Sequence, residues 1–217
     1  MKILVLGATG RTGRWVVDAA LDAGNSVHCL ARNMQRIAAR PELTVFDGNP
    51  AHADALAKAM EGCEGIINVL NVSRKSDFPW APLRTPPTFL SEVMTNVIRQ
   101  AEANPVARLV VCSAWGVAET RADIPGWFRW FIDHSNIGAA YQDHERQEAL
   151  VTASNLSWTI VRPVGLTNGS AKRGIRASFD NQPAPNMLIS RRSVAHYLVE
   201  CLSDDRLVGK KVVISRD

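Results

Sequence analysis

Short apolar runs alternate with amphipathic stretches along this chain. Runs with the length of buried strands occur at residues 3–6, 27–31, 43–46, 66–70, 109–112, 157–161 and 211–214. Apolar residues recur at intervals of three and four, as on one helix face, at residues 14–24, 51–61, 89–104, 139–148 and 193–202, and the third of these helices should end near Pro105. This alternation predicts an α/β fold: a doubly wound, mostly parallel sheet with helices on both faces.

Length, composition and charge limit the number of domains, the class of protein and the kinds of partner that we expect. The 217 residues suit one α/β domain without repeats, so we expect a single domain over 1–217, with a small substrate-side region at about 163–192, where Lys172 begins a polar, proline-rich stretch. No apolar run has membrane-spanning length and a strand begins at residue 2, so we expect a cytoplasmic protein without a membrane partner or signal peptide. The four cysteines lack metal-type spacing, and the basic residues behind the net charge of +4 are dispersed. We therefore expect reduced thiols, no metal, no nucleic-acid partner, and a monomer or homodimer that binds small molecules.

The stretch after the first apolar run carries three glycines at intervals of three, Gly7, Gly10 and Gly13. In a strand–turn–helix unit, the first would permit a sharp turn, the second would let the backbone approach a pyrophosphate, and the third would let the helix pack closely on the strand. The helix N-terminus would offer N–H groups and a positive dipole end to the phosphates. This context favours a dinucleotide-binding Rossmann fold over an ordinary turn.

Arg32 and Arg36 follow the second apolar run, where the adenosine ribose of a dinucleotide is recognised. A carboxylate there would repel a 2′-phosphate, whereas Arg32, assisted by Arg36 or Arg11, offers it a charge-assisted pair, so the sequence predicts NADP(H). The alternative for Arg32 is a solvated strand end. Asp47, after the third run, would lie at the adenine edge, although a turn carboxylate also suits a helix cap.

Polar or irregular residues also follow the later runs, at the sheet edge where ligands bind. Asn71 ends the fourth run, and we place it among the cofactor-binding residues; Ser113 follows the fifth run, where its hydroxyl would face a nicotinamide. Residues 72–87 contain four prolines and predict either a lid or an ordinary surface loop. After the sixth run, a stretch that would present backbone groups to the ligand consists of Pro163, Val164, Gly165 and Leu166.

Two further segments are candidates for contact with a substrate. The aromatic residues Trp127, Phe128, Trp130 and Phe131 suit a stacking wall for a flat substrate or, equally, a short helix packed on the core or at a dimer contact. On the next predicted helix, one face carries Tyr141, His144, Glu145 and Glu148. That face predicts either a chemical role or a solvated helix surface.

These motifs together resemble the atypical short-chain dehydrogenase/reductases, and within them the NAD(P)H-binding group that includes biliverdin-IXβ reductase, or flavin reductase. The resemblance rests on Gly7-Ala-Thr-Gly10-Arg-Thr-Gly13, Leu30-Ala-Arg32, Val111-Cys-Ser113-Ala, Asp143-His144-Glu145 and Arg162-Pro163 with Gly165. It implies NADPH bound across a doubly wound sheet and hydride transfer to a flavin, tetrapyrrole or quinone.

The same resemblance implies roles for single residues. By position, Thr9, Arg11 and Thr12 would hold the pyrophosphate, Arg32 the 2′-phosphate, and residues 163–166 the nicotinamide side. Ser113 would match the active-site serine of the family, and His144 the histidine of this branch.

One departure from the common short-chain enzymes affects the chemistry. Those enzymes use Tyr-x-x-x-Lys, whereas Glu145 follows Tyr141 here, and a carboxylate raises the pKa of a neighbouring phenol. Alcohol oxidation is therefore disfavoured, while reduction of a flavin or quinone needs less from the protein. A sugar-nucleotide epimerase is disfavoured by the missing lysine and the chain length.

We expect an NADPH-dependent reductase of a flat conjugated acceptor. Its catalytic candidates are Ser113, His144 and Tyr141. The alternative is an NADP(H)-binding redox sensor without turnover.

Overall fold

The computed structural model describes residues 1–104, 106–171 and 174–217, so that Pro105 and Lys172 lie outside the described residues. Within these ranges the strands are β1 (Lys2–Leu6), β2 (Ser26–Ala31), β3 (Leu43–Asp47), β4 (Gly65–Asn68), β5 (Arg108–Cys112), β6 (Trp158–Pro163), β7 (Gly165–Thr167), β8 (Ile175–Ser178), β9 (Leu188–Ser190) and β10 (Lys210–Arg216). The α-helices are α1 (Gly13–Asp22), α2 (Ala53–Met60), α3 (Phe89–Ala103), α4 (Gly126–Asp133), α5 (Gly138–Ala153) and α6 (Arg191–Glu200). Short 3₁₀ helices are η1 (Met34–Arg36), η2 (Ala118–Ala122) and η3 (Asp205–Leu207).

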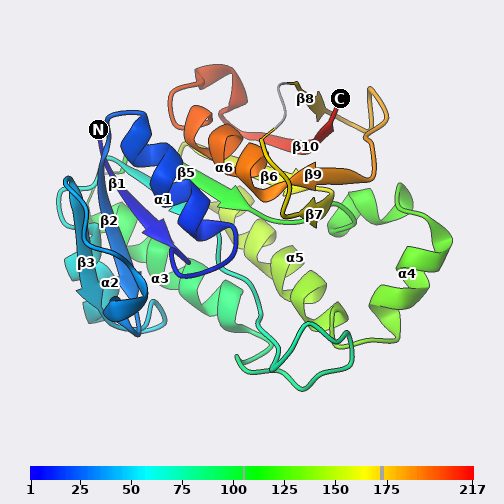
Figure 1. Cartoon of the computed structure of the whole chain (residues 1–217), viewed down its shortest axis with the longest axis horizontal. Helices are drawn as coiled ribbons and strands as arrows, with labels where there is room; N and C mark the ends of the chain where they lie inside the picture. Colours follow the sequence, from blue (N-terminus) through cyan, green and yellow to red (C-terminus); the bar gives the residue numbers. More distant parts are fainter. Residues whose placement is uncertain (105, 172–173) are drawn as a thin grey trace.

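Eight strands form one sheet in the order β3-β2-β1-β4-β5-β6-β10-β8 (Figure 1). The first seven in this order are parallel, and β8 pairs antiparallel with β10 at the edge. The chain runs outward from β1 to β3 and then continues at β4 on the other side of β1. Ligands of such sheets bind beyond the carboxyl ends of the strands at this reversal. The doubly wound fold predicted from the apolar alternation is confirmed.

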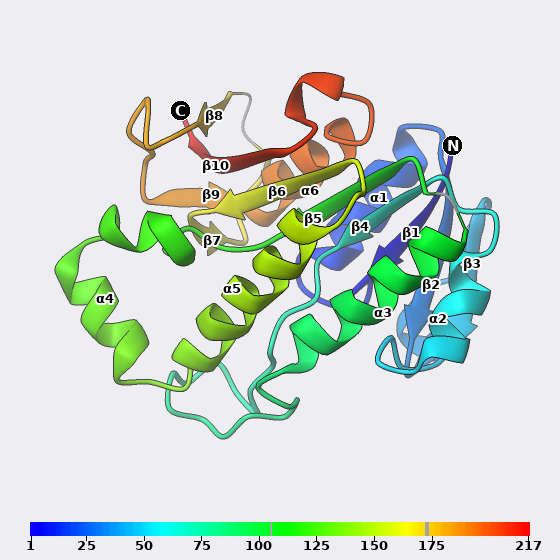
Figure 2. The same cartoon turned by 180° about the vertical axis from the view of Figure 1, so that it is seen from behind.

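Helices cover both faces of the sheet: α1 and α6 lie on one face, and α2, α3 and α5 on the other (Figures 1 and 2). The central strand β1 contributes side chains to the hydrophobic cores on both faces of the sheet. Ile3 and Val5 pack into the core on the α1 side, and Leu4 and Leu6 into the core on the α2 side. Because both of its faces are buried, the sequence of β1 is continuously apolar from Ile3 to Leu6 rather than alternating.

Two parts at the carboxyl edge depart from the regular pattern. Helix α4 stands away from the sheet beyond α5 (Figure 1), and β7 and β9 form a small parallel sheet of their own. The pairing of β7 with β9 could not be predicted, because strands of three residues carry almost no periodicity. No helix among the described residues is both long and apolar enough to cross a bilayer.

Candidate cofactor and acceptor site

The glycine loop joins β1 to α1. Gly7 has φ +92°, a conformation that glycine adopts without strain, and a Cβ on it would lie 2.9 Å from the carbonyl oxygen of Val69. A Cβ on Gly13 would overlap the carbonyl oxygen of Gly7, so α1 can begin this close to the turn only without a side chain there. The predicted turn and packing roles of Gly7 and Gly13 are confirmed, whereas access to a pyrophosphate at Gly10 stays a prediction.

The start of α1 has the features of an anion site. Thr12, at its N-cap, makes no capping hydrogen bond through its side chain, and the first turn holds no acidic residue. In the part of the chain that the structure describes, the backbone N–H groups of Arg11, Thr12 and Gly13 donate to no main-chain acceptor. The side chains of Arg11 and Arg14 add positive charge beside these N–H groups. A dinucleotide pyrophosphate fits this cradle, since it would satisfy the N–H groups and the helix dipole together.

The residues predicted for the adenosine end emerge from neighbouring strands. Ala31 of β2 pairs with Asp47 of β3, so Arg32 and Asp47 lie close together at the carboxyl edge. Both are exposed, as is Arg36 in η1. Asn71 is also exposed, beyond the end of β4. Contact of these side chains with a cofactor stays a prediction.

Ser113 follows β5 and is 5% exposed. Its N–H donates to the carbonyl oxygen of Val161 at 2.8 Å, which fixes its backbone beside β6. Its Oγ is buried and has no hydrogen-bond partner among the described residues. An unsatisfied buried polar group costs about 1–3 kcal/mol. A ligand group placed beside β5 would remove this cost.

Tyr141 reaches the same edge from α5. Its hydroxyl donates to the carbonyl oxygen of Trp115 at 3.3 Å, and its ring meets Phe128 edge-on at 6.3 Å between centroids. Burial raises the pKa of Tyr141 to about 12. The sequence predicts that Glu145 raises the pKa of Tyr141; Glu145 is exposed, and the cause of the raised pKa is burial of the phenol. The phenol is therefore protonated at neutral pH.

His144 is 4% exposed, and burial lowers its pKa to about 4, although the neighbouring Asp143 carboxylate opposes this effect. At neutral pH the imidazole is uncharged, so it can form hydrogen bonds but is no cationic acid. Glu148 is also buried, whereas Glu145 is exposed. The alternative of a solvated helix surface is therefore wrong for His144 and Glu148.

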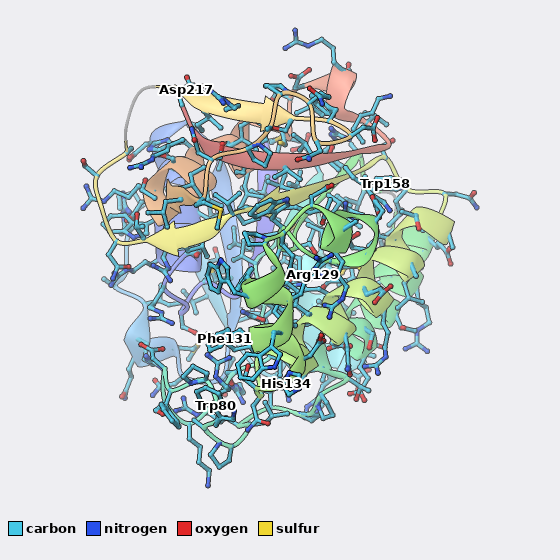
Figure 3. The ribbon with its side chains drawn as sticks, turned by 90° about the vertical axis from the view of Figure 1, so that its right-hand side faces the viewer. Trp80, Arg129, Phe131, His134, Trp158 and Asp217 are labelled. Atoms are coloured by element: carbon cyan, nitrogen blue, oxygen red, sulfur yellow. The ribbon has the colours of Figure 1, made fainter. Side chains whose placement is uncertain are left out.

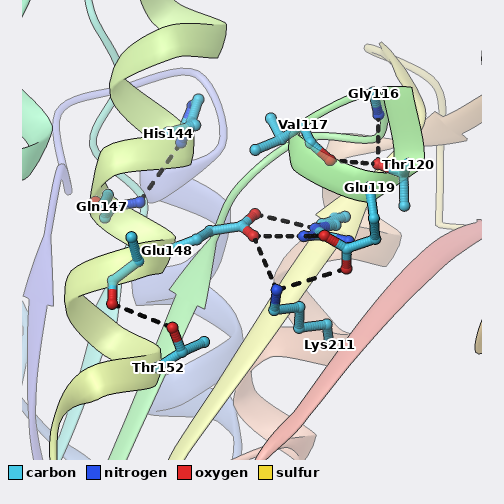
Figure 4. Close-up of polar contacts among 11 residues, drawn as sticks. Gly116, Val117, Glu119, Thr120, His144, Gln147, Glu148, Thr152 and Lys211 are labelled. Atoms are coloured by element: carbon cyan, nitrogen blue, oxygen red, sulfur yellow. Dashed lines mark hydrogen bonds and ion pairs between the residues drawn. The ribbon is translucent and has the colours of Figure 1, made fainter. Parts of the chain in front are cut away.

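A polar chain that the sequence analysis missed connects His144 to β4. Asn68 Nδ2 donates to Gln147 Oε1 at 2.9 Å. Gln147 Nε2 in turn lies 3.5 Å from His144 Nδ1, and Figure 4 shows this second contact. Because the Gln147 oxygen accepts from Asn68, its amide nitrogen donates to the imidazole, and the ring proton lies on Nε2. The interval of three between His144 and Gln147 on a predicted helix was the available signal.

Arg162 on β6 is the centre of a second, partly buried polar group, whose members Glu119, Glu148 and Lys211 are labelled in Figure 4. It is 2% exposed and donates to both carboxylate oxygens of Glu148, at 3.0 and 2.5 Å, and to both of Glu119, at 2.7 and 3.1 Å. Lys211 of β10 lies 3.5 Å from Glu119. The hydrogen bonds from Arg162 lower the pKa of Glu119 to about 2. This group joins α5, β6, η2 and β10 beside the site.

The stretch after β6 uses its backbone differently from the prediction. The Val164 N–H donates to the carbonyl oxygen of Ile214 at 3.2 Å, and the Gly165 N–H donates to that of Met187 at 3.0 Å. These two amides are therefore bound within the protein rather than presented to a ligand. The assignment of Pro163, Val164, Gly165 and Leu166 to the nicotinamide side stays a prediction.

The aromatic residues of α4 face two directions. Phe128 and Phe131 turn inward and stack at 6.5 Å, and Phe131 meets Trp80 edge-on at 5.7 Å (Figure 3). Trp127 and Trp130 are exposed. Since residues three apart share a helix side, the four rings form an inner and an outer pair. The prediction of one stacking wall from all four is corrected.

Residues 72–87 span the edge between the glycine loop and α4. Both carboxylate oxygens of Asp77 accept from Arg11, at 3.0 and 2.9 Å. Trp80 Nε1 donates to the carbonyl oxygen of His134 at 2.6 Å, just after α4. The segment thus has the position a lid would need, and a lid function stays a prediction.

Two curated relatives resemble nearly the whole chain. An oxidoreductase of Pestalotiopsis microspora is 24% identical over 92% of this chain and 79% of its own length. The photosystem II assembly factor Ycf39 of Synechocystis is 25% identical over 97% of this chain, which spans only 61% of that protein.

Solved structures share the fold. A short-chain dehydrogenase/reductase of Veillonella parvula in complex with NADP has a TM-score of 0.80 at 17% identity, over 99% of this chain and 94% of that one. ChuY, an anaerobilin reductase of Escherichia coli O157:H7, has a TM-score of 0.79 at 18% identity, over 100% and 97%. These likenesses confirm the predicted Rossmann-type fold. Residues 7–205 match the NAD(P)H-binding family, and the chain therefore belongs to this family.

Proposed function

We propose that the protein is an NADPH-dependent reductase that transfers hydride to a flat conjugated acceptor such as a flavin, quinone or tetrapyrrole. The observation that carries this proposal is the buried, unpartnered Oγ of Ser113 at the carboxyl end of β5. This is the edge where ligands of a doubly wound sheet bind. The name of ChuY as an anaerobilin reductase, and the NADP complex of the Veillonella enzyme, support the substrate class and the cofactor.

The cofactor side uses the glycine loop and the ends of β2 and β3. The N–H groups at the start of α1 would bind the pyrophosphate. Arg32 and Arg36, both exposed, would bind the 2′-phosphate that distinguishes NADPH from NADH. When bound, NADPH would supply the hydride.

The acceptor side uses neutral hydrogen-bond donors. The Ser113 hydroxyl would donate to the acceptor atom that gains charge, and this interaction would strengthen in the transition state. Tyr141, with its pKa raised to about 12, stays protonated and would hold the edge at Trp115 through the hydrogen bond it already makes. A flavin or quinone can take its proton from water, so no cationic acid is required from His144.

Replacing Ser113 tests this proposal. We expect Ser113→Ala to lower kcat/KM for a flavin or quinone by at least about tenfold, since it removes a donor used mainly in the transition state. NADPH affinity should stay nearly unchanged. Ser178→Ala is the matched control, because Ser178 Oγ is equally buried and unpartnered but lies on the edge strand β8. Full activity of Ser113→Ala across an acceptor panel would contradict the proposal.

The second candidate is an NADP(H) sensor without turnover, and the Arg11–Asp77 pair favours it. Arg11 is assigned to the pyrophosphate, so cofactor binding would compete with Asp77 and could report on residues 72–87. A sensor would bind NADPH tightly, but none of the acceptors in the panel would cause NADPH to be oxidised. Residues 72–87 would adopt different conformations with NADPH and with NADP⁺.

A further inference from the structure

Exposed large apolar side chains gather on one side of the molecule. Among the described residues, the carboxyl edge carries Phe78, Trp80, Trp127, Trp130, Leu166, Met187 and Leu188. Four of these are aromatic: Phe78 is 62% exposed, Trp80 46%, Trp127 66% and Trp130 58%. We call these four residues the aromatic corner. Aromatic residues exposed to this extent mark an interaction surface more often than a solvated one.

Contacts connect three residues of the aromatic corner, and the fourth, Trp127, lies three residues before Trp130 on the same side of α4. Phe78 lies 5.3 Å from Trp80 between ring centroids. Trp80 is bonded to the carbonyl oxygen of His134, whose ring stacks on Trp130 at 4.6 Å. Figure 3 looks at this side and shows Trp80, Phe131 and His134 together, with Arg129 on the helix above them. The corner joins residues 72–87 to α4.

The charge around the aromatic corner is positive. Segments 72–87 and 126–136 contain four cations, Arg74, Lys75, Arg84 and Arg129, against the two acids Asp77 and Asp133. Both acids already pair with arginines outside these segments, Asp77 with Arg11 and Asp133 with Arg121. Lys75, Arg84 and Arg129 are exposed. The surface therefore combines indole rings with unneutralised positive charge.

We propose that the aromatic corner docks on the surface of an anionic lipid bilayer. Tryptophan side chains favour the headgroup level of a bilayer, where an apolar ring and a polar N–H are both satisfied. Basic side chains beside them are attracted by anionic headgroups. The expectation of no membrane partner rested on the lack of a spanning run, which a surface-bound protein does not need.

A second copy of the chain fits this surface less well. A two-fold dimer would place the same patch on both sides of the interface and bring the cations Lys75, Arg84 and Arg129 against the same set of cations. Like charges opposed in this way are unfavourable. Docking on lipid instead leaves each cation opposite a phosphate, and it turns the carboxyl edge, with Ser113, toward the membrane.

Vesicle flotation with the full chain tests this proposal. We expect binding to vesicles of phosphatidylcholine with phosphatidylglycerol, little binding to phosphatidylcholine alone, and loss of binding at high salt. Trp127→Ser with Trp130→Ser should weaken binding at least about tenfold, because two of the four exposed rings are removed. Arg129→Glu should weaken binding to the anionic vesicles as well. Phe179→Ser is the matched control, since Phe179 is 40% exposed but follows the edge strand β8.

Each alternative gives a distinct result. The proposal is overturned if the parent protein stays unbound on anionic vesicles, or if the double tryptophan variant binds as well as the Phe179→Ser control. It is also overturned if light scattering shows that the parent protein is a dimer and the double tryptophan variant a monomer, while neither of the two binds lipid. The replaced side chains are exposed, so circular dichroism should show that the variants keep the fold. If the double tryptophan variant unfolds, Arg129→Glu alone tests the proposal. None of these measurements depends on enzymatic turnover.

Discussion

Arg32 is the residue to which we attribute the proposed preference for NADPH over NADH. It is exposed directly after β2, beside Asp47. Loss of a charge-assisted phosphate contact should lower NADPH affinity in Arg32→Ala by about 1.5–3 kcal/mol. NADH affinity should change little, because NADH lacks the phosphate. Titration calorimetry with both cofactors measures this, with Arg216→Ala as control; equal dissociation constants for the parent protein would contradict NADPH preference.

The buried imidazole of His144 should make stability depend on pH. Burial lowers its pKa from 6.5 to about 4, so between these values the unfolded chain binds more protons than the folded protein. The free energy of unfolding should therefore rise with pH across this window and fall on acidification, by up to about 3 kcal/mol. Urea denaturation at several pH values should show a flatter dependence for His144→Gln than for the parent protein or His196→Gln, a change at an exposed position.

The roles of some single residues could be predicted from the sequence, and those of others could not. The spacing of Gly7 and Gly13 predicted their roles, because close backbone approach excludes any other residue there. Asn68 and Gln147 could not be assigned, since a polar residue at a strand end or on a helix has the same pattern whether solvated or buried. The partner that satisfies each amide comes from 79 residues away in the chain.

At the scale of elements, two glycines near the start of α1 should have different roles, Gly13 in stability and Gly10 in cofactor binding. Gly13→Ala would push a Cβ into the carbonyl oxygen of Gly7, so we expect a loss of about 2 kcal/mol or more in stability. A Cβ on Gly10 would lie 3.0 Å from that oxygen, a tight but smaller conflict. Gly10→Val should therefore stay folded and lose NADPH binding, because its side chain blocks the pyrophosphate. Thermal unfolding and cofactor titration separate the two effects; normal affinity in Gly10→Val would show that the loop is structural only.

The contact of β6 with α5 depends on the buried ion pair of Arg162 and Glu148. Arg162→Met should cost about 3–5 kcal/mol, because it leaves the Glu148 carboxylate buried without its main partner. Arg162→Met with Glu148→Leu should recover much of this loss. Glu119→Gln should cost far less, since the Glu119 side chain is more than half exposed and water screens its charge. Urea denaturation compares the variants; equal losses for Arg162→Met and Glu119→Gln would contradict this account.

Elements with a strong apolar period were predicted within a few residues, and those defined by distant partners were not. The helix expected at 89–104 is Phe89–Ala103, because its apolar side is buried against the sheet. Two peripheral elements were harder to place: α4 carries large aromatic rings on its exposed as well as its inner side, and β8 is a strand of four residues at the lateral edge of the sheet. Their positions depend on contacts such as those between Trp80 and Phe131, which no local pattern encodes.

At the scale of the whole molecule, the parallel sheet brings separate chain segments to one edge. The glycine loop, Arg32, Ser113, residues 72–87 and α4 come from the first two thirds of the sequence and meet at the carboxyl ends of the strands. This convergence follows from the topology, so the sequence predicted which segments meet. It could not predict the bonds between them, such as the pair of Arg11 and Asp77 across 66 residues.

That pair predicts how the molecule responds to its cofactor. Arg11 is assigned to the pyrophosphate, and Asp77 is a carboxylate that an incoming phosphate would repel. If NADPH displaces Asp77, residues 76–81 lose the anchor at Arg11 and keep their hydrogen bonds to the chain after α4, which involve His134 and Asn136. We expect hydrogen exchange in this segment to speed up on NADPH binding, and Asp77→Asn to bind NADPH several-fold more tightly because the competing charge is gone. Asp133→Asn, which breaks an ion pair at the end of α4 instead, is the matched control. Slower exchange with NADPH, together with weaker binding by Asp77→Asn, would instead mean that Asp77 holds the segment closed over the cofactor.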